Sequence, residues 1–133
     1  MKIISLNVNG FRSAIKKNLI SWFLSEKADV ICLQEIKATE LCLPPEINLL
    51  KDYYAYYFPA EKKGYSGVAI FSLKKPHLVH YGLGWSPADE EGRYLQADFG
   101  DLSVASIYLP SGSAGAHRQE KKFIFLEIGR AHV

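Results

Sequence analysis

The sequence predicts an α/β fold. Residues 1–33 have the pattern of a strand, a helix and a second strand, because their apolar residues recur first at alternate positions, then at helical spacing, and then as a continuous run. Further short strands follow, separated by turns that contain Gly or Pro, and the last two have the alternation of a hairpin. With 133 residues, the chain can hold one domain with a real core.

The opening segment alternates apolar and polar residues, with Ile4, Leu6 and Val8 on one face of the expected strand and Asn7 and Asn9 on the other. A helix should follow, because Ser13 can act as its cap. The apolar residues expected on one face of this helix are Ile15, Leu19, Trp22 and Phe23.

A candidate site lies at the ends of the first two strands. The apolar run from Val30 to Leu33 predicts a buried strand, and Glu35 comes just beyond its carboxyl end. If this strand neighbours the first, Asn7 and Glu35 converge on one hard cation, since Mg²⁺ accepts carboxylate and amide oxygens. Taken alone, Glu35 is equally consistent with a solvated strand-end residue, and Asn7 with a turn former.

The rest of the chain continues as short elements. We expect strands at residues 53–58, 67–72, 78–81, 93–99 and 102–108, the last two as a hairpin around Gly100 and Asp101. A short helical turn is expected at 46–50, a loop at 82–91, and the start of a helix within 117–122.

Composition leaves the partner open and indicates the compartment. A net charge of +2 does not by itself indicate nucleic acid, whose footprint is local clustering of Lys and Arg. Cys32 falls in a buried strand and Cys42 in a loop, without metal-type spacing, so both are interpreted as reduced thiols of a cytoplasmic protein. No segment has the length and hydropathy of a transmembrane helix or the pattern of a signal peptide.

Five motifs, in this order and with these gaps, resemble the exonuclease III / apurinic (AP) endonuclease family of the endonuclease/exonuclease/phosphatase superfamily. The motifs are Leu6 to Arg12, Asp29 to Lys37, Gly64 to Ala69, Glu91 to Arg93 and Tyr108 to Pro110. The resemblance implies a DNase I-like α/β sandwich, with two sheets face to face and outer helices. That family needs about twice this length, so the resemblance also implies that residues 1–127 hold the amino-terminal half of one such domain.

The resemblance implies a Mg²⁺-dependent DNA repair nuclease, with Mn²⁺ as an alternative ion. Glu35 would be the metal ligand, Asn7 would support the metal or the phosphate, and the Tyr108 hydroxyl would reach the scissile phosphate as a donor or a phenolate. The residues that the resemblance places against DNA are Asn9, Arg12, Lys37, Tyr65, Ser66, Arg93 and Ser111. The implied partner is double-stranded DNA with abasic sites or 3′ ends, without a membrane, and the implied full-length state is a monomer.

The chain departs from the family pattern in two places. Ser111 stands where many relatives have Asn or Gln after the Tyr-x-Pro motif, which shortens any polar reach towards the phosphate. The family's later Asp-x-Asn motif and terminal Asp-His pair would lie beyond Leu126. Residues 128–133 do not continue the family pattern, and their codons can match a sequencing-library adapter, so we interpret them as a non-native tail, with Glu127 as a hybrid codon.

Two rivals to the nuclease hypothesis remain at this point. One is a phosphatase or phospholipase of the same superfamily that acts on small or lipid phosphoesters. The other is a non-catalytic DNA-binding fragment, because the expected water-activating groups are not among the residues named above. Tyr65, Arg93 and the Tyr108 motif favour DNA as the substrate over small phosphoesters.

Overall fold

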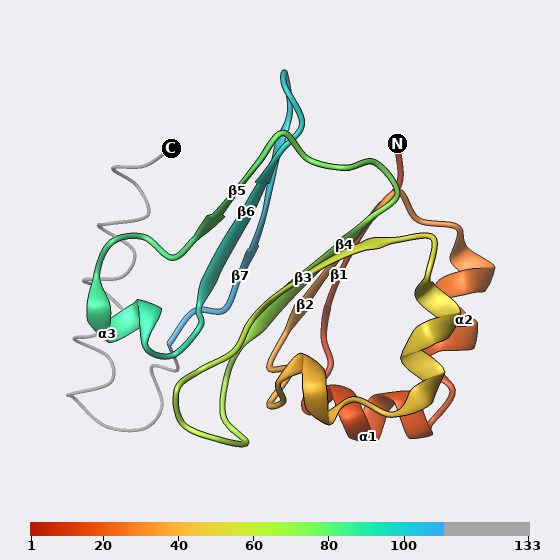
Figure 1. Cartoon of the computed structure of the whole chain (residues 1–133), viewed down its shortest axis with the longest axis horizontal. Helices are drawn as coiled ribbons and strands as arrows, with labels where there is room; N and C mark the ends of the chain where they lie inside the picture. The colour runs from red at the N-terminus through yellow and green to blue at the C-terminus, as the bar shows by residue number, and fades with distance from the viewer. Residues whose placement is uncertain (111–133) are drawn as a thin grey trace.

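The computed structural model describes residues 1–110 and arranges them as two β-sheets with helices outside them (Figure 1). The strands are β1 (Ile3–Asn7), β2 (Val30–Gln34), β3 (Tyr54–Phe58), β4 (Val68–Ser72), β5 (Leu78–Tyr81), β6 (Tyr94–Asp98) and β7 (Ser103–Ile107). The helices are α1 (Phe11–Lys16), α2 (Leu19–Glu26) and α3 (Ser86–Asp89), with 3₁₀ turns at Glu40–Cys42 and Pro45–Leu50.

The first sheet has the strand order β1-β2-β4-β3, and the second has the order β5-β6-β7. Strand β1 runs parallel to β2, with Asn7 opposite Gln34, and all other pairs are antiparallel. The connection from β1 to β2 runs through α1 and α2, as a parallel pair requires. The carboxyl ends of β1 and β2 therefore lie together at one edge of the sheet.

The first sheet is the central layer, with α1 and α2 on one face and the second sheet on the other (Figure 1). Its central strands β2 and β4 are buried along their whole length because they are covered on both faces. One apolar cluster joins the helices to this sheet, around Phe11, Phe23 and Phe71. A second joins the two sheets, around Ile70 and Leu95. The predicted α/β class and the face-to-face sheets are confirmed.

The single helix predicted after the first strand is two helices. Asn18 adopts a left-handed backbone conformation, with φ of 68°, and this ends the continuity between α1 and α2. Ser13 lies inside α1, whose cap position is Gly10, so the capping role predicted for Ser13 was wrong. In α2, Ile20 is buried and Trp22 is 43% exposed, so the expected core position of Trp22 was wrong.

Most of the remaining predicted elements are confirmed. The strands predicted at 53–58, 67–72 and 78–81, and the hairpin at 93–108, occur as β3 to β7 with differences of one or two residues at their ends. The predicted loop at 82–91 was wrong in part, because it contains α3. No helix within residues 1–110 is long and apolar enough to cross a membrane. Ser111, the helix start expected within 117–122 and the tail at 128–133 lie outside the described residues.

Candidate active site

Asn7 and Glu35 meet at the edge of the first sheet where β1 and β2 end. The Asn7 Nδ2 atom donates a hydrogen bond of 2.8 Å to Glu35 Oε1. The parallel pairing of β1 and β2 produces this contact, because it brings both carboxyl ends to the same edge. The predicted convergence of these two side chains is therefore observed.

The orientation of the Asn7 amide is set by the backbone of Asn9. The Asn9 backbone N–H donates to Asn7 Oδ1 at 3.0 Å, and a backbone N–H can only donate. The amide nitrogen of Asn7 must therefore face Glu35. In this geometry Asn7 orients the carboxylate. Its amide oxygen keeps a second lone pair, so the role of Asn7 as a metal ligand stays a prediction.

Lys37 neutralises part of the charge at this edge. Its Nζ donates to Asn9 Oδ1 at 2.8 Å and lies 3.5 Å from Glu35 Oε2. Partial burial opposes ionisation of Glu35, but hydrogen bonds from Asn7 and Tyr108 and the charge of Lys37 outweigh it and lower the pKa of the carboxyl. Glu35 is thus held as a carboxylate with a fixed orientation.

The backbone around the site is strained. Asn9, Glu35, Lys37 and Ser66 have positive φ angles of 45°, 53°, 52° and 49°, in a region that residues other than Gly rarely adopt. Hydrogen bonds hold these residues in place, including one of 2.8 Å from Gly10 N to the Glu35 carbonyl and one of 2.9 Å from Lys37 N to the Ser66 carbonyl. Such strain concentrates at functional sites. No pattern in the amino-acid sequence indicates this strain.

Tyr108 reaches the same edge from the second sheet. It lies just past β7, half-buried, and its hydroxyl is near enough to the Glu35 carboxylate for each group to shift the pKa of the other. Burial, together with the hydrogen bond to the Glu35 carboxylate and the charge of that carboxylate, raises the pKa of Tyr108 to about 12. Of the two forms considered from the sequence, a hydroxyl donor and a phenolate, this arrangement favours the donor.

Arg93 is buried behind Tyr108. Its side chain is 2% exposed, Nη1 donates to the Tyr108 carbonyl at 3.1 Å, and the guanidinium lies 4.9 Å from the centre of the Tyr108 ring. Nη2 donates to the Tyr65 hydroxyl at 3.2 Å, and Nε lies 3.3 Å from Glu91 Oε1. The prediction that Arg93 contacts DNA does not fit this position, because the polar atoms around the guanidinium belong to the protein.

Ser66 also differs from its predicted role in DNA contact. Its side chain is 1% exposed, and its Oγ has no hydrogen-bond partner within residues 1–110. Its backbone carbonyl instead holds Lys37. Tyr65 next to it is half-buried, and Lys62 Nζ lies 5.4 Å from the centre of the Tyr65 ring, within the range of a cation–π contact.

A cation-rich cavity of about 600 Å³ lies between the loop after Glu35 and the loop before β4. Four cationic side chains line it, together with Tyr65 and one acidic side chain, Glu61. The four cations are Arg12, Lys37, Lys62 and Lys63. Local clustering of this kind is typical of a phosphate-binding surface, and the overall charge of +2 had concealed it.

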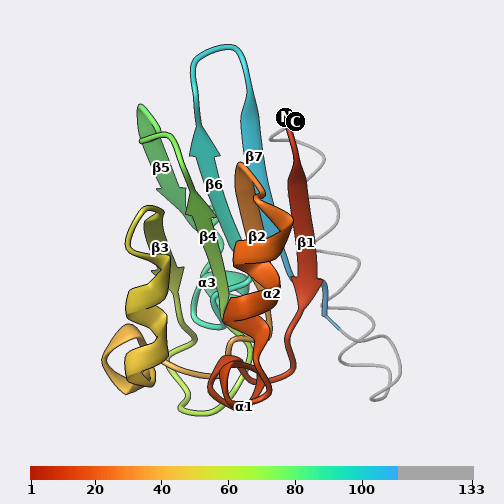
Figure 2. The same cartoon turned by 90° about the vertical axis from the view of Figure 1, so that its right-hand side faces the viewer.

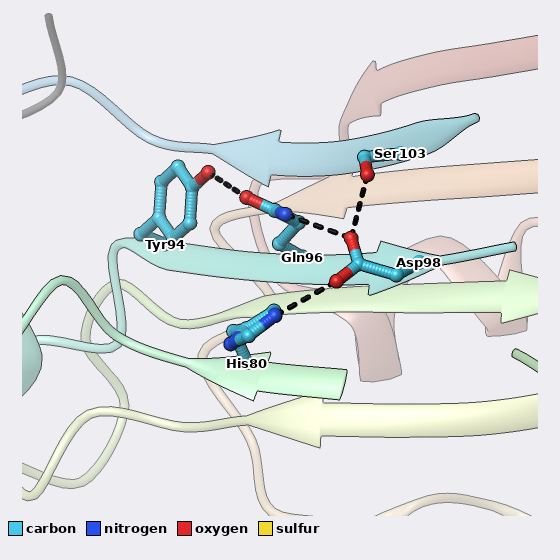
Figure 3. Close-up of polar contacts among 5 residues, drawn as sticks. All are labelled: His80, Tyr94, Gln96, Asp98 and Ser103. Carbon is cyan, nitrogen blue, oxygen red and sulfur yellow. Dashed lines mark hydrogen bonds and ion pairs between the residues drawn. The ribbon is translucent and has the colours of Figure 1, made fainter. Parts of the chain in front are cut away.

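A second polar cluster lies on the opposite side of the β5-β6-β7 sheet from the core (Figure 3). Asp98 is at its centre, accepting hydrogen bonds from Ser103 at 2.6 Å and Gln96 at 2.8 Å, and pairing with His80 at 2.8 Å. Tyr94 donates to Gln96. No role was assigned to His80 from the sequence. The polar residues at alternate positions of β6 are the one sequence feature that could have predicted this cluster.

The donor set at the sheet edge is compatible with a hard cation but incomplete. Glu35 offers a charged, oriented oxygen ligand, which is what Mg²⁺ prefers. Within residues 1–110, no group of three or more His, Cys, Asp or Glu side chains could hold a metal ion. Glu35 can therefore anchor an ion whose other ligands are water, substrate or residues outside this range.

The chain resembles known nucleases in sequence and in structure. Residues 4–131 match the model of the endonuclease/exonuclease/phosphatase family. The chain is 41% identical over 120 residues to DNA repair nuclease APEX1 of Danio rerio, and 42% identical over 121 residues to the exodeoxyribonuclease of Bacillus subtilis. Each match covers 89% of this chain, but only 39% and 46% of those relatives.

The structure of an AP endonuclease from Archaeoglobus fulgidus superposes with a TM-score of 0.82 at 32% identity, covering 96% of this chain and 49% of that one. The chain thus spans about half the length of the proteins it matches. The order of the strands, the convergence of Asn7, Glu35 and Tyr108, and these matches lead to one conclusion. The chain belongs to the endonuclease/exonuclease/phosphatase family.

Proposed function

We propose that this chain is the amino-terminal half of a Mg²⁺-dependent DNA repair nuclease that cuts at abasic sites and trims 3′ ends. The observation that supports this most directly is the meeting of Asn7, Glu35 and Tyr108 at one edge of the two sheets. A metal ligand and a hydroxyl donor side by side can stabilise the charge that develops on the phosphate during hydrolysis of a phosphodiester. The named activities of the relatives agree with this proposal.

Each residue has a definite task in this proposal. Glu35 would hold Mg²⁺, for which Mn²⁺ could substitute, and the bound ion would supply positive charge to stabilise the phosphate oxygens. Asn7 keeps the Glu35 carboxylate in a single orientation. The Tyr108 hydroxyl donates a hydrogen bond to a phosphate oxygen once substrate displaces its contact with Glu35. The residue that activates the attacking water lies outside the described part of the chain.

The cavity beside Glu35 would hold the DNA backbone. Arg12 and Lys37 line it, and Asn9 is bonded to Lys37 at its margin. Phosphate contacts of this kind position a duplex without reading its sequence. An abasic nucleotide is also easier to swing out of the helix than an intact one, so recognition of the lesion can depend on deformability. Ser111 would add a contact to the DNA backbone, because it directly follows the Tyr108 to Pro110 motif in the sequence.

The proposal includes a domain boundary and a compartment. Residues 1–127 would be half of one domain, and 128–133 a non-native tail. The cytoplasm is the proposed location, which fits two free thiols, one of them on the exposed Cys42. The full-length protein would act as a monomer.

The experiment uses a joined enzyme, in which residues 1–126 are followed by the carboxy-terminal half of the Bacillus subtilis relative. We expect it to cut an abasic duplex in Mg²⁺ and to leave a phosphoinositide intact. The opposite preference would support the phosphoesterase rival, and binding without turnover would support the DNA-binding rival.

Glu35→Gln in the joined enzyme is the matched variant, because it keeps the size of the side chain and removes the charge that anchors the ion. We expect turnover to fall by several orders of magnitude, on the order of 10³-fold or more, with the circular dichroism unchanged. Glu35→Ala should be at least as damaging. Near-normal turnover of either variant at saturating Mg²⁺ would exclude Glu35 as the metal ligand.

A further inference from the structure

Gln34 and Ser106 form a polar contact in the core between the two sheets. The side chain of Gln34 points from β2 and Ser106 belongs to β7, and the two residues are 9% and 0% exposed. The Gln34 Nε2 atom donates to Ser106 Oγ at 3.0 Å. The surrounding inter-sheet residues are apolar, among them Cys32 and Val104. This contact therefore ties the facing strands of two different sheets.

The hydrogen bonds of this contact have one possible direction. Ser106 Oγ also lies 2.8 Å from the Leu33 carbonyl, which can only accept, so the single hydroxyl proton of Ser106 must go there. The lone pairs of Ser106 then face the Gln34 amide. A further bond of 3.2 Å joins Gln34 Nε2 to Ser5 Oγ on β1. The Leu33 carbonyl and the Gln34 side-chain amide, both on β2, are thus hydrogen-bonded to one hydroxyl on β7, that of Ser106.

These residues are immediate neighbours of the site in the chain. Glu35 follows Gln34 directly, and Tyr108 comes two residues after Ser106. Glu35 and Tyr108 face each other from the ends of the same two strands. A shift of β7 along β2 would separate the Tyr108 hydroxyl from the Glu35 carboxylate by the same amount.

We propose that Gln34 and Ser106 are positioning residues that set the distance between Glu35 and Tyr108. Apolar packing alone does not select one register between two facing sheets, because it is non-directional. A buried hydrogen bond is directional, and a register shift would leave its donor and acceptor without partners. The inference rests on the proposed function, since it assigns the pair to the same site.

The burial of the pair separates this role from substrate binding. Gln34 and Ser106 cannot reach DNA, so any effect of their replacement on turnover must pass through Glu35 or Tyr108. Substrate binding should be unaffected when Ser106 is replaced, because no cation of the cavity lies on β7.

The test replaces Ser106 with Ala in the joined enzyme. Ser106→Ala removes one oxygen from a tight site, and displacements of about 1 Å can cost about 10²-fold in rate, so we expect kcat to fall by about 10- to 100-fold while KM stays unchanged. Ser106→Thr keeps the hydroxyl and should restore most of the loss. Ser103→Ala is the matched control, because it makes the same change on the same strand with the side chain on the other face.

Three outcomes would overturn the proposal. They are an unchanged kcat in Ser106→Ala, a failure of Ser106→Thr to restore it, and an equal loss in Ser103→Ala. If the unaltered joined enzyme does not cut DNA at all, the proposed function fails, and this is distinguishable from a failure of the positioning role.

A measurement on the joined enzyme and its two Ser variants tests the structural part independently of turnover. Nuclear magnetic resonance should detect the Ser106 hydroxyl proton in slow exchange with water and close to the Gln34 side-chain amide. The ring signals of Tyr108 should move in Ser106→Ala and stay in place in Ser103→Ala. A rapidly exchanging Ser106 hydroxyl, or an unmoved Tyr108 ring, would contradict the positioning role.

Discussion

At the scale of single residues, exposure separates groups that can contact DNA from groups that support them. Arg12 is exposed and lines the cavity, whereas Arg93 is 2% exposed and stacked on Tyr108. Both were expected to contact DNA on the basis of the sequence. Their positions imply different consequences when each is replaced.

Arg12→Ala in the joined enzyme should weaken DNA binding and flatten its dependence on salt. Loss of one phosphate contact reduces the slope of log K against log salt by about 0.9. Fluorescence anisotropy with an abasic-analogue duplex, titrated over a range of salt concentrations, measures this slope. An unchanged slope would remove Arg12 from the interface.

Arg93→Met in the same protein should leave the salt slope unchanged and reduce kcat, because it removes the support of the Tyr108 ring and carbonyl but no phosphate contact. Met keeps much of the buried volume. We expect a loss of about tenfold or more in kcat, typical of a displaced reacting group. A flattened slope with normal kcat would return Arg93 to the DNA interface.

At the scale of elements, the outer face of β6 carries a polar ladder on a sheet whose inner face is apolar (Figure 3). Hydrogen bonds from Ser103 and Gln96, with a smaller contribution from His80, lower the pKa of Asp98 to about 2. The cluster links β5, β6 and β7, so the carboxylate stabilises the pairing of all three strands.

Asp98→Asn should therefore lower the free energy of unfolding at pH 7 by about 1 kcal/mol, a modest value because the side chain is partly exposed. The folded pKa lies below the usual value of 3.8, so this stabilisation is present above about pH 4 and is lost as the pH falls towards 2. Urea unfolding at several pH values measures the difference. Asp52→Asn, on an exposed turn, is the control. A difference that persists at pH 2 would contradict the assignment.

At the scale of the whole molecule, each sheet has two edge strands without a further partner strand within residues 1–110. One edge of each sheet, β1 and β7, lies on the same side of the molecule (Figure 2). Each edge carries an exposed apolar side chain, Ile3 at 46% and Ile107 at 43%. Unpaired edges of this kind promote association between chains.

The 133-residue chain by itself should have no appreciable nuclease activity and should self-associate. A positioned general base contributes about 10²- to 10⁴-fold to the rate, and the proposed function places that base outside residues 1–110. Size-exclusion chromatography and a cleavage assay on an abasic duplex test both expectations. Coexpression with the carboxy-terminal half of the Bacillus subtilis relative should restore a discrete species and activity. A monomer that cuts efficiently alone would contradict this prediction.

The local pattern of residues determined most of the elements, because each depends on neighbours in the chain. The alternation in β1 and in the β6–β7 hairpin, and the apolar run of β2, were enough to locate these strands. The pairing of Asn7 with Glu35 was also predictable, because a strand, a helix and a strand in succession favour a parallel pair whose carboxyl ends coincide.

Only the tertiary structure decided what each site residue can touch. The burial of Arg93 and Ser66 could not be read from the chain. The amide orientation of Asn7 depends on a contact with Asn9, two positions away, and the bond from Gln34 to Ser106 spans 72 positions. The left-handed break at Asn18 and the positive φ of Glu35 have no periodicity that a sequence could display. At Glu35 the conformation is held by a long-range hydrogen bond from Gly10 N, which overrides local preference.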